Sequence, residues 1–150
     1  MAGTQYVVFS INQQFFGIEI FKIREVLSYR KITPLPQMEG FIKGIITLRG
    51  AIIPVFDLRE KFKLPTAAEY TRFHVIIVVE ISGRITGVIV DDISDVLEIF
   101  PEEFQTTGNL PSNVRREYLK GVGKKDDKMI ILLDMDHLLS HEELELADAT

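Results

Sequence analysis

Cysteine is absent from this chain of 150 residues. Its absence excludes disulfides, thiol catalysis, and zinc or iron–sulfur sites with cysteine ligands. Basic residues are fewer than acidic ones: 17 Lys and Arg stand against 22 Asp and Glu, for a formal net charge of -5 and an isoelectric point near 5.2. Nucleic acids and anionic membranes are bound through a basic face that releases counterions. Neither is an expected partner, although the overall charge leaves room for a local basic patch.

Long apolar runs are also missing. The longest, such as 75–79 and 129–133, have five residues, whereas a membrane-spanning helix needs roughly 18 to 20. Residues 1–6 contain no Lys or Arg and no apolar stretch of signal-peptide length. We therefore expect a cytoplasmic protein without direct membrane insertion. Since 46% of its residues are hydrophobic, the chain can form a core without a metal or disulfide.

Motifs that mark common enzymes are missing as well: there is no nucleophile elbow, phosphate loop, dinucleotide fingerprint or His-Glu-x-x-His helix. His137 and His141 are four residues apart, which would place them on one face of a helix, but a metal would need a third ligand such as Glu142 or Asp136. Solvated surface histidines explain the pair more simply. The sequence thus predicts no catalytic residue, no metal site and no cofactor.

One acidic cluster offers an alternative. Asp91, Asp92 and Asp95, followed by Glu98, could hold a hard cation or supply an acid–base pair in a small ligand-binding or metal-binding β-barrel. The cluster lacks the spacing of a calcium loop, and the apolar residues between the acids have the pattern of a half-buried strand. We interpret it first as a solvated face.

An internal repeat decides the architecture. Residues 6–27 match 76–97 at a constant offset of 70, and residues 41–62 match 118–139 at an offset of 77. Gly17 aligns with Gly87, and Asp57 aligns with Asp134. Chance similarity between two Val/Ile-rich segments is the alternative, but glycines and an aspartate in register favour a duplication.

Each half is predicted to consist of strands. Residues 6–11 and 75–81 are β-branched or aromatic runs followed by a polar turn and a second run, which is typical of a hairpin. Arg49 and Gly50 form a two-residue turn in which glycine can take a positive φ angle. Helix is minor: Asp57 and Glu60 suggest a capping box for a short turn through residue 62, and Ser140 begins a second, acidic one. Many short strands with few helices favour a small barrel or sandwich per half.

The two halves differ at that hairpin. Arg49 and Gly50 align with Asp126 and Asp127, so only the first half carries a cation at this tip. Arginine pairs with carboxylates through two hydrogen bonds and is enriched at protein interfaces. Arg49 is either an interface residue or a solvated turn residue.

At these residues the sequence resembles the CheW-type chemotaxis coupling proteins, whose fold also occurs as the regulatory domain of the CheA histidine kinase. The resemblance runs in order from about residue 5 to 140. Its matching segments are YVVFSI (6–11), FGIEIFKIREVL (16–27), FIKGIITLRG (41–50), IPVFDL (53–58), GVIVDDISDVL (87–97), YLKG (118–121) and IILLD (130–134). One departure is Thr47, where the family usually has Asn before Leu-Arg-Gly.

The resemblance implies an all-β fold of two small five-stranded β-barrel subdomains on a shared hydrophobic core, with short helical turns and a short C-terminal helix. We expect a single domain over 1–150, with the first barrel at 15–81 and the second at 82–150. The N-terminal strand, 1–14, would pack with the second barrel. The chain length leaves no room for a kinase core or a receiver domain.

The resemblance also implies a non-enzymatic adaptor that couples the cytoplasmic signalling tips of chemoreceptors to the regulatory domain of the CheA kinase. It would be a monomer in isolation and be recruited from the cytoplasm to receptor arrays at the inner membrane. The positions that match the family's contact residues are Ile23, Glu25, Val26, Gly44, Arg49, Gly50 and Val96. The valines and isoleucine could form an apolar groove for a receptor helix or belong to the core, and Arg49 and Glu25 could pair with each other or across an interface.

Overall fold

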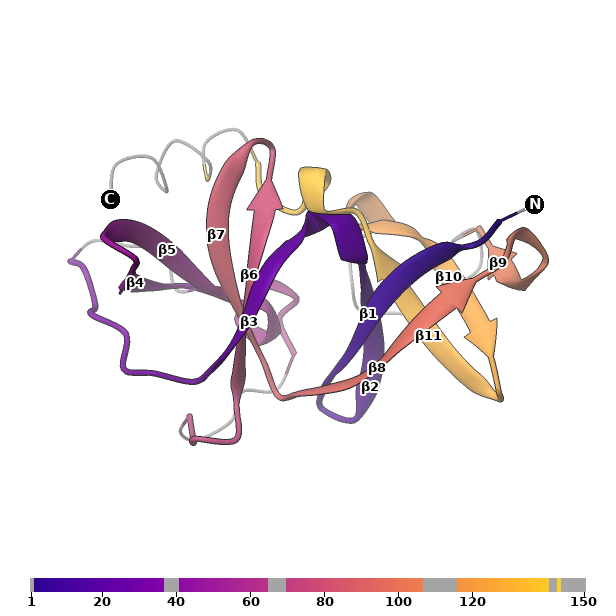
Figure 1. Ribbon diagram of the computed structural model, residues 1–150, viewed down its shortest axis with the longest axis horizontal. Coiled ribbons are helices and arrows are strands. Elements are labelled where there is room, and N and C mark those ends of the chain that lie inside the picture. The colour runs from indigo at the N-terminus through magenta and orange to yellow at the C-terminus, as the bar shows by residue number, and fades with distance from the viewer. Residues whose placement is uncertain (1, 37–40, 65–69, 107–115, 141–142, 144–150) are drawn as a thin grey trace.

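The computed structural model describes residues 2–36, 41–64, 70–106, 116–140 and 143, and it places two β-sheets side by side along the long axis of the molecule (Figure 1). The all-β prediction is confirmed. Within these ranges, no helix combines the length and the apolar content needed to cross a membrane.

The six-stranded sheet has the order β8–β1–β2–β11–β10–β9, and the five-stranded sheet has the order β3–β6–β7–β5–β4. The strands of the six-stranded sheet are β1 (Thr4–Ile11), β2 (Gln14–Glu19), β8 (Asp92–Ile99), β9 (Phe104–Gln105), β10 (Leu119–Lys125) and β11 (Lys128–Leu133). Those of the five-stranded sheet are β3 (Ile23–Ser28), β4 (Ile42–Leu48), β5 (Ala51–Asp57), β6 (Val75–Ile81) and β7 (Arg84–Val90). The described helical segments are α1 (Leu58–Lys61) and the 3₁₀ turns η1 (Ile20–Lys22), η2 (Pro101–Glu103), η3 (Arg116–Tyr118) and η4 (Met135–His137).

The two halves of the sequence exchange hairpins. The β1–β2 hairpin of the first half pairs with β8 and β11 of the second, and the β6–β7 hairpin of the second half pairs with β3 and β5 of the first. Both parallel pairings have the same register: Val55 faces Gly87, and Leu132 faces Gly17. These two pairs are equivalent under the offsets of 70 and 77, so the pairing repeats with the sequence.

The predicted boundary between the two subdomains, between residues 81 and 82, does not separate the two sheets. That boundary falls in the turn of the β6–β7 hairpin, and β7 stays in the same sheet as β6, while β2 lies beside β11. A two-residue turn brings its strands side by side, so the hairpin cannot be shared between sheets. β1 lies with strands of the second half, next to β8.

The hydrophobic core has three parts, because the exchanged hairpins are buried on both faces. On β6, Ile77 and Val79 point to a core shared by the two sheets, and Ile76 and Val78 point into the five-stranded sheet. Tyr6 and Val8 of β1 likewise point into the six-stranded sheet. Burial on both faces explains the continuous apolar run at 75–79, since a strand with one solvated face would alternate.

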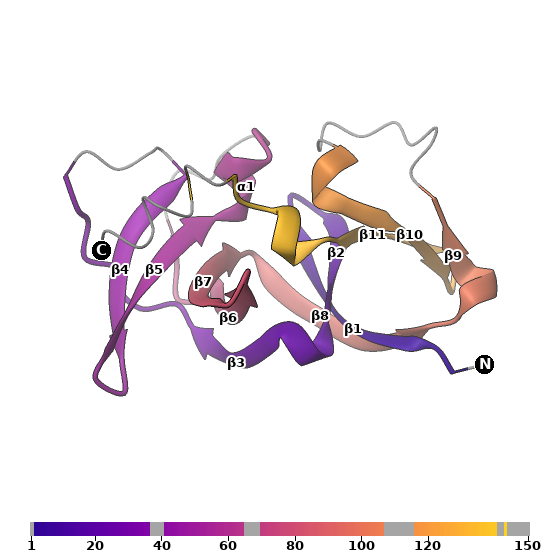
Figure 2. The same cartoon turned by 90° about the horizontal axis from the view of Figure 1, so that it is seen from above.

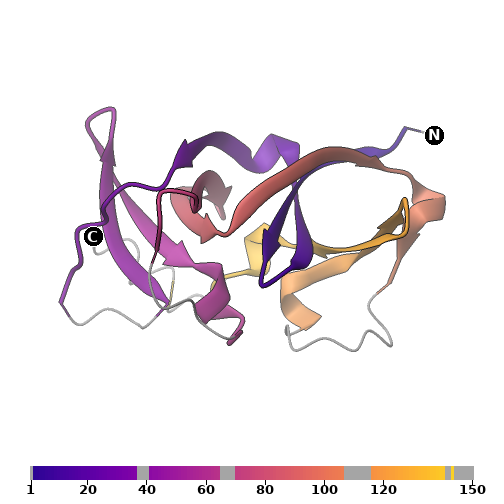
Figure 3. The same ribbon diagram turned by 90° about the horizontal axis from the view of Figure 1, so that it is seen from below.

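The six-stranded sheet is curled, as Figure 3 shows, and in both sheets the segment that follows one edge strand reaches the opposite side of the sheet. After β8, the chain passes through η2 into β9, which pairs with β10. After β3, Thr33 forms a bridge with Ile45 of β4, with both N···O distances at 2.9 Å. In both halves, therefore, the segment after the outer strand pairs with the first strand of the following hairpin.

Bulges interrupt the outer strands at equivalent places. The pairing of β3 with β6 skips Arg24, and the pairing of β1 with β8 skips Ser94, its counterpart at offset 70. A bulge bends a strand and changes the direction of the side chains beside it. Each bulge lies within two residues of a candidate contact residue, Val26 in β3 and Val96 in β8.

The predicted caps are present in part. Asp57 accepts a hydrogen bond from the main-chain N–H of Arg59 (2.8 Å) and caps α1, while Glu60 forms an ion pair with Lys43. Ser140 and Glu143 hydrogen-bond reciprocally, N–H to side chain, at 2.7 and 3.1 Å, as in a capping box. The short C-terminal helix predicted to follow lies outside the described residues, apart from residue 143.

Candidate functional site

The outer strands β3 and β8 lie on one face of the molecule. This face is turned toward the viewer in Figure 1 and lies along the bottom of Figure 2. Val26 of β3 is 47% exposed, and Val96 of β8 is 51% exposed. Ile23 is half-buried and packs against the shared core. The face therefore offers two large apolar side chains to a partner, one from each sheet, and a third that is mainly structural.

An ion pair stands beside Val26. Arg49 binds the carboxylate of Glu25 through both terminal nitrogens, with a distance of 3.3 Å from Nη2 to Oε2. This hydrogen bond is the main reason that the pKa of Glu25 is lowered and that of Arg49 is raised. The pair joins the β4–β5 turn to β3, and the Arg49 side chain remains largely exposed.

Arg49 and Gly50 form the predicted turn, with φ angles of 50° and 81°. The space around the Gly50 Cα is open, so glycine is needed there only for its backbone conformation. Thr47, the departure from the family pattern, is exposed on β4 opposite Ile52. The replacement therefore leaves the turn intact.

Gly44 has a different role from its neighbours in the predicted site. It is buried, its φ angle is 144°, and a Cβ atom there would overlap the carbonyl oxygen of Thr33. Gly121, its counterpart in the second half, would overlap the carbonyl oxygen of Gln105 in the same way. Gly44 thus permits the chain after β3 to cross β4 and supports the sheet rather than presenting a surface.

The acidic cluster does not form a site. Asp91 accepts hydrogen bonds from the guanidinium of Arg59 and from the main-chain N–H of Asn12 (2.9 Å). Its negative charge is therefore paired with a cation of the same chain. Asp95 accepts from the N–H of Val96 (3.0 Å), and Asp92 is exposed. In the described part of the chain, no group of three or more His, Asp or Glu residues is arranged to hold a metal ion. The alternative hypothesis of a ligand or metal site at Asp91, Asp92 and Asp95 is not supported.

His137, one of the two histidines interpreted as solvated surface residues, has a partner close to it in the chain. His137 lies 2.8 Å from Asp134, measured from Nδ1 to Oδ2, and is part of η4. His141 lies outside the described residues. The carboxylate partner of His137 comes from its own turn, which is typical of a surface histidine.

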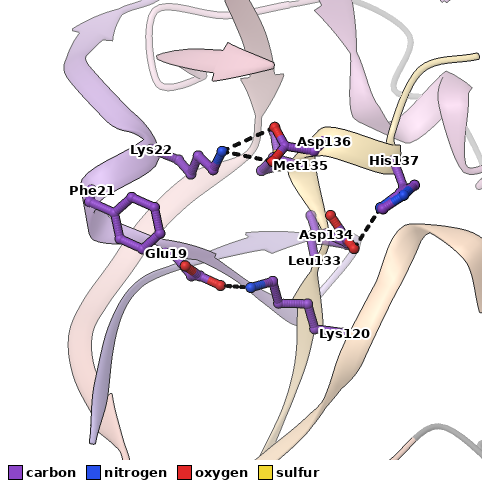
Figure 4. Close-up of a pocket in the computed structure, with 9 residues that line it drawn as sticks. All are labelled: Glu19, Phe21, Lys22, Lys120, Leu133, Asp134, Met135, Asp136 and His137. Atoms are coloured by element: carbon purple, nitrogen blue, oxygen red, sulfur yellow. Dashed lines mark hydrogen bonds and ion pairs between the residues drawn. The ribbon is translucent and has the colours of Figure 1, made fainter. Parts of the chain in front are cut away.

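A pocket that the sequence did not predict lies between η1, β10 and η4 (Figure 4). Its volume is about 390 Å³. Phe21 is 68% exposed at its rim, and Leu133 and Met135 are buried at its base. The remaining lining residues are Glu19, Lys22, Lys120, Asp134, Asp136 and His137. Its residues come from three distant segments, so no local pattern could have indicated it.

The charged groups of this pocket satisfy one another. Glu19, only 6% exposed, pairs with Lys120, and Lys22 binds Asp136 at 2.9 and 3.0 Å. His137 binds Asp134. Because every charged lining residue is already paired, the pocket has no free charge with which to recognise a ligand, and its ion pairs act as ties between η1, β10 and η4.

Comparison with known proteins identifies the family to which this chain belongs. The family model described as CheW-like domain matches residues 5–143. The chain is 36% identical to the chemotaxis protein CheW of Klebsiella aerogenes over 97% of its length and 87% of the relative's. It is 33% identical to CheW of Rhizobium meliloti, covering 97% and 93% of the two chains. The crystal structure of the scaffolding protein TtCheW from Thermoanaerobacter tengcongensis is similar with a TM-score of 0.85 and 34% identity, covering 95% of this chain and 92% of the other. The chain therefore belongs to the CheW-like domain family.

Proposed function

We propose that this protein is a non-enzymatic scaffold of bacterial chemotaxis, which joins the cytoplasmic tips of chemoreceptors to the regulatory domain of the CheA kinase. Its relatives are named chemotaxis protein CheW, and the similar crystal structure is that of a scaffolding protein. The chain matches them over nearly its whole length. The protein would work in the cytoplasm and be recruited to receptor arrays.

The observation that carries this proposal is the exposure of Val26 on β3 and of Val96 on β8, two outer strands that lie on one face of the molecule. Exposed apolar side chains at matched positions suit the apolar stripe of a receptor helix. The Glu25–Arg49 pair lies at the edge of this surface. Such an exposed pair contributes little binding energy but influences the choice of partner.

A scaffold of this kind acts through coupling free energy. It binds the receptor and the kinase together, with modest affinity for each, and the array adds avidity. No residue of the chain needs to take part in a reaction. The state of the receptor reaches the kinase because both partners bias the same assembly.

Co-sedimentation tests the proposal. The purified protein is mixed with membranes that contain chemoreceptors, with and without CheA, and ATP-dependent phosphorylation of CheA is followed in the same samples. We expect the protein to sediment with the receptor and to be required for receptor control of the kinase. A folded protein that binds neither partner would overturn the proposal and leave only the fold in common with the family.

A further inference from the structure

The pocket between η1, β10 and η4 has a filled counterpart in the other half of the molecule. Two of its lining residues, Asp134 and His137, correspond to Asp57 and Glu60 at offset 77. Tyr70 donates a hydrogen bond from its hydroxyl to Asp57. Burial raises the pKa of Tyr70, and the nearby carboxylates of Asp57 and Glu60 raise it further. A tyrosine side chain therefore lies beside the counterparts of two pocket residues.

A histidine ring lies beside the counterpart of a third. The ring of His74 packs edge-on against Tyr70, with centroids 5.5 Å apart, and its Nε2 atom lies 3.7 Å from Oδ1 of Asp91. Asp91 corresponds at offset 70 to Phe21, which stands at the rim of the pocket. In the first half, the rings of Tyr70 and His74 thus fill the place that the pocket leaves open in the second.

The second half supplies no such ring. Residues 119–150 contain no Phe, Tyr or Trp. Asp57, which lies against Tyr70, is buried, whereas the side chain of Asp134 is 26% exposed. Asp57 also caps α1, but Asp134 makes no cap hydrogen bond. A carboxylate has about four acceptor sites, so Asp134 can bind His137 and still accept a hydrogen bond from a guest.

The walls of the pocket suit an aromatic guest. Its volume of about 390 Å³ is within the range of small-molecule sites. Leu133 and Met135 form an apolar base, and a methionine sulfur makes favourable contacts with aromatic rings. The exposed ring of Phe21 offers a surface for stacking. In Figure 4, this ring and the carboxylate of Asp134 stand on opposite sides of the pocket.

The ion pairs of the pocket select against a charged guest. Lys22 is paired with Asp136, and Glu19 is paired with Lys120. A charged molecule would have to displace one member of a pair and leave a partly buried charge without its partner, which is costly. An uncharged molecule leaves both pairs in place.

We propose that this pocket binds a phenol group, whose hydroxyl donates to Asp134 and whose ring packs between Phe21 and the apolar base. The hydrogen bond to Asp134 would repeat the one that Tyr70 makes to Asp57 in the other half. The phenol can belong to a free small molecule or to a tyrosine side chain of another protein, since both offer the same group. Binding here requires neither a chemoreceptor nor a kinase.

A titration followed by NMR tests the site. The probe is p-cresol, which is the side chain of tyrosine as a free molecule, added to the isotope-labelled protein. We expect saturable shifts of the amide signals of residues 19–22 and 133–137. Toluene, which lacks the hydroxyl, should bind at least about tenfold more weakly, because it cannot form the hydrogen bond to the carboxylate. Benzoate, which is charged, should leave these signals unshifted.

Two substitutions separate the contacts. Asp134→Ala should reduce the affinity for p-cresol to that for toluene, and Phe21→Ala should weaken the binding of both compounds. The matched control is Phe73→Ala, because Phe73 is 72% exposed and Phe21 is 68% exposed. It changes the segment before β6 in the other sheet and should leave both affinities as in the parent. Since Phe21 is a surface residue, Phe21→Ala tests the site even where Asp134→Ala fails to fold.

A short peptide, acetyl-Gly-Tyr-Gly-amide, distinguishes the two sources of the phenol. If it shifts the same signals with at least the affinity of p-cresol, the guest is a tyrosine side chain; if only p-cresol binds, the guest is a free small molecule. Three results would overturn the proposal: shifts by p-cresol that do not saturate or that lie elsewhere, equal affinities for toluene and p-cresol, or parental affinity for p-cresol in Phe21→Ala.

Discussion

Asp91 and Asp136 each accept a hydrogen bond from the main-chain N–H of a hairpin turn. The donor to Asp91 is Asn12 in the β1–β2 turn, at 2.9 Å, and the donor to Asp136 is Ser82 in the β6–β7 turn, at 3.1 Å. Asn12 and Ser82 correspond at offset 70, so both exchanged hairpins are held at their tips by a carboxylate. We call these contacts the Asp91 clamp and the Asp136 clamp.

The two clamps have opposite polarity. In the Asp91 clamp, the carboxylate follows β7 and the cation is Arg59 of α1; in the Asp136 clamp, the carboxylate belongs to η4 and the cation is Lys22 of η1. Arg59 and Asp136 occupy equivalent positions at offset 77, so a cation in one half stands where an anion stands in the other. The duplication has thus conserved the contact between turn and carboxylate while exchanging the charges around it.

The clamps should differ in their contribution to stability. The side chain of Arg59 is 8% exposed, and its Nε atom has no hydrogen-bond partner, whereas Asp136 is 47% exposed. We expect Asp91→Asn to lower the free energy of unfolding by about 3 kcal/mol, because it leaves a buried cation unpaired. Asp136→Asn should cost only about 0.5 kcal/mol, since water screens an exposed pair. Urea unfolding of both variants measures this difference, and equal losses would contradict it.

Acid should remove the contribution of the Asp136 clamp. The hydrogen bond from Lys22 is the main reason that the pKa of Asp136 is lowered from its ordinary value of 3.8. A carboxyl with a lower pKa in the folded state stabilises the protein above its unfolded pKa, and this stabilisation is lost as the pH falls through the folded value. We therefore expect the difference between the parent and Asp136→Asn to be constant above about pH 5, to shrink as the pH falls below 3.8, and to vanish only below the lowered pKa of the folded state. Urea unfolding at several pH values tests this; a difference that grew in acid would show that the sign is wrong.

Reversal of Arg49 to Glu should weaken partner binding and leave folding intact. Arg49 is 74% exposed on a turn whose conformation depends on Gly50, and its ion pair with Glu25 is solvated. The melting temperature of Arg49→Glu should stay within a few degrees of the parent, while co-sedimentation with receptor membranes falls. Lys124→Glu, on the hairpin of the other sheet, is the matched control and should keep binding. A collapse in thermal stability would mean that Arg49 is structural.

Glycine substitutions separate a supporting residue from a surface residue. A Cβ atom at position 44 would overlap Thr33, whereas one at position 50 meets open space and only the backbone strain remains. We expect Gly44→Ala to lower the free energy of unfolding by about 3 kcal/mol or more through overpacking. Gly50→Ala should cost about 1 kcal/mol, the strain of a side chain in the left-handed region. Guanidinium unfolding provides the comparison. If Gly44→Ala were as stable as the parent but failed to bind partners, Gly44 would belong to the contact surface after all.

Local patterns identified much of the candidate site. The Arg49–Gly50 turn was predicted from two residues, whereas Val26 and Val96 were named from the family resemblance, which left open whether they lie at the surface or in the core; the structure shows both exposed. The acidic cluster was misleading because spacing alone cannot show that Asp91 faces Arg59, 32 residues away in the chain. The pocket beside Phe21 could not be predicted, since Lys22, Lys120 and Asp136 come together only in the folded protein.

The sequence by itself determined the duplication, the strands, the turn at Arg49–Gly50 and the all-β class, because each depends on residues close together in the chain. The tertiary structure alone decided which strands share a sheet. β2 and β7 have the same pattern, and nothing local tells whether Gly17 packs beside Leu132 or beside Val55; the pairing follows from contacts between residues far apart in sequence. Hairpin exchange, the shared core and both clamps all follow from that choice.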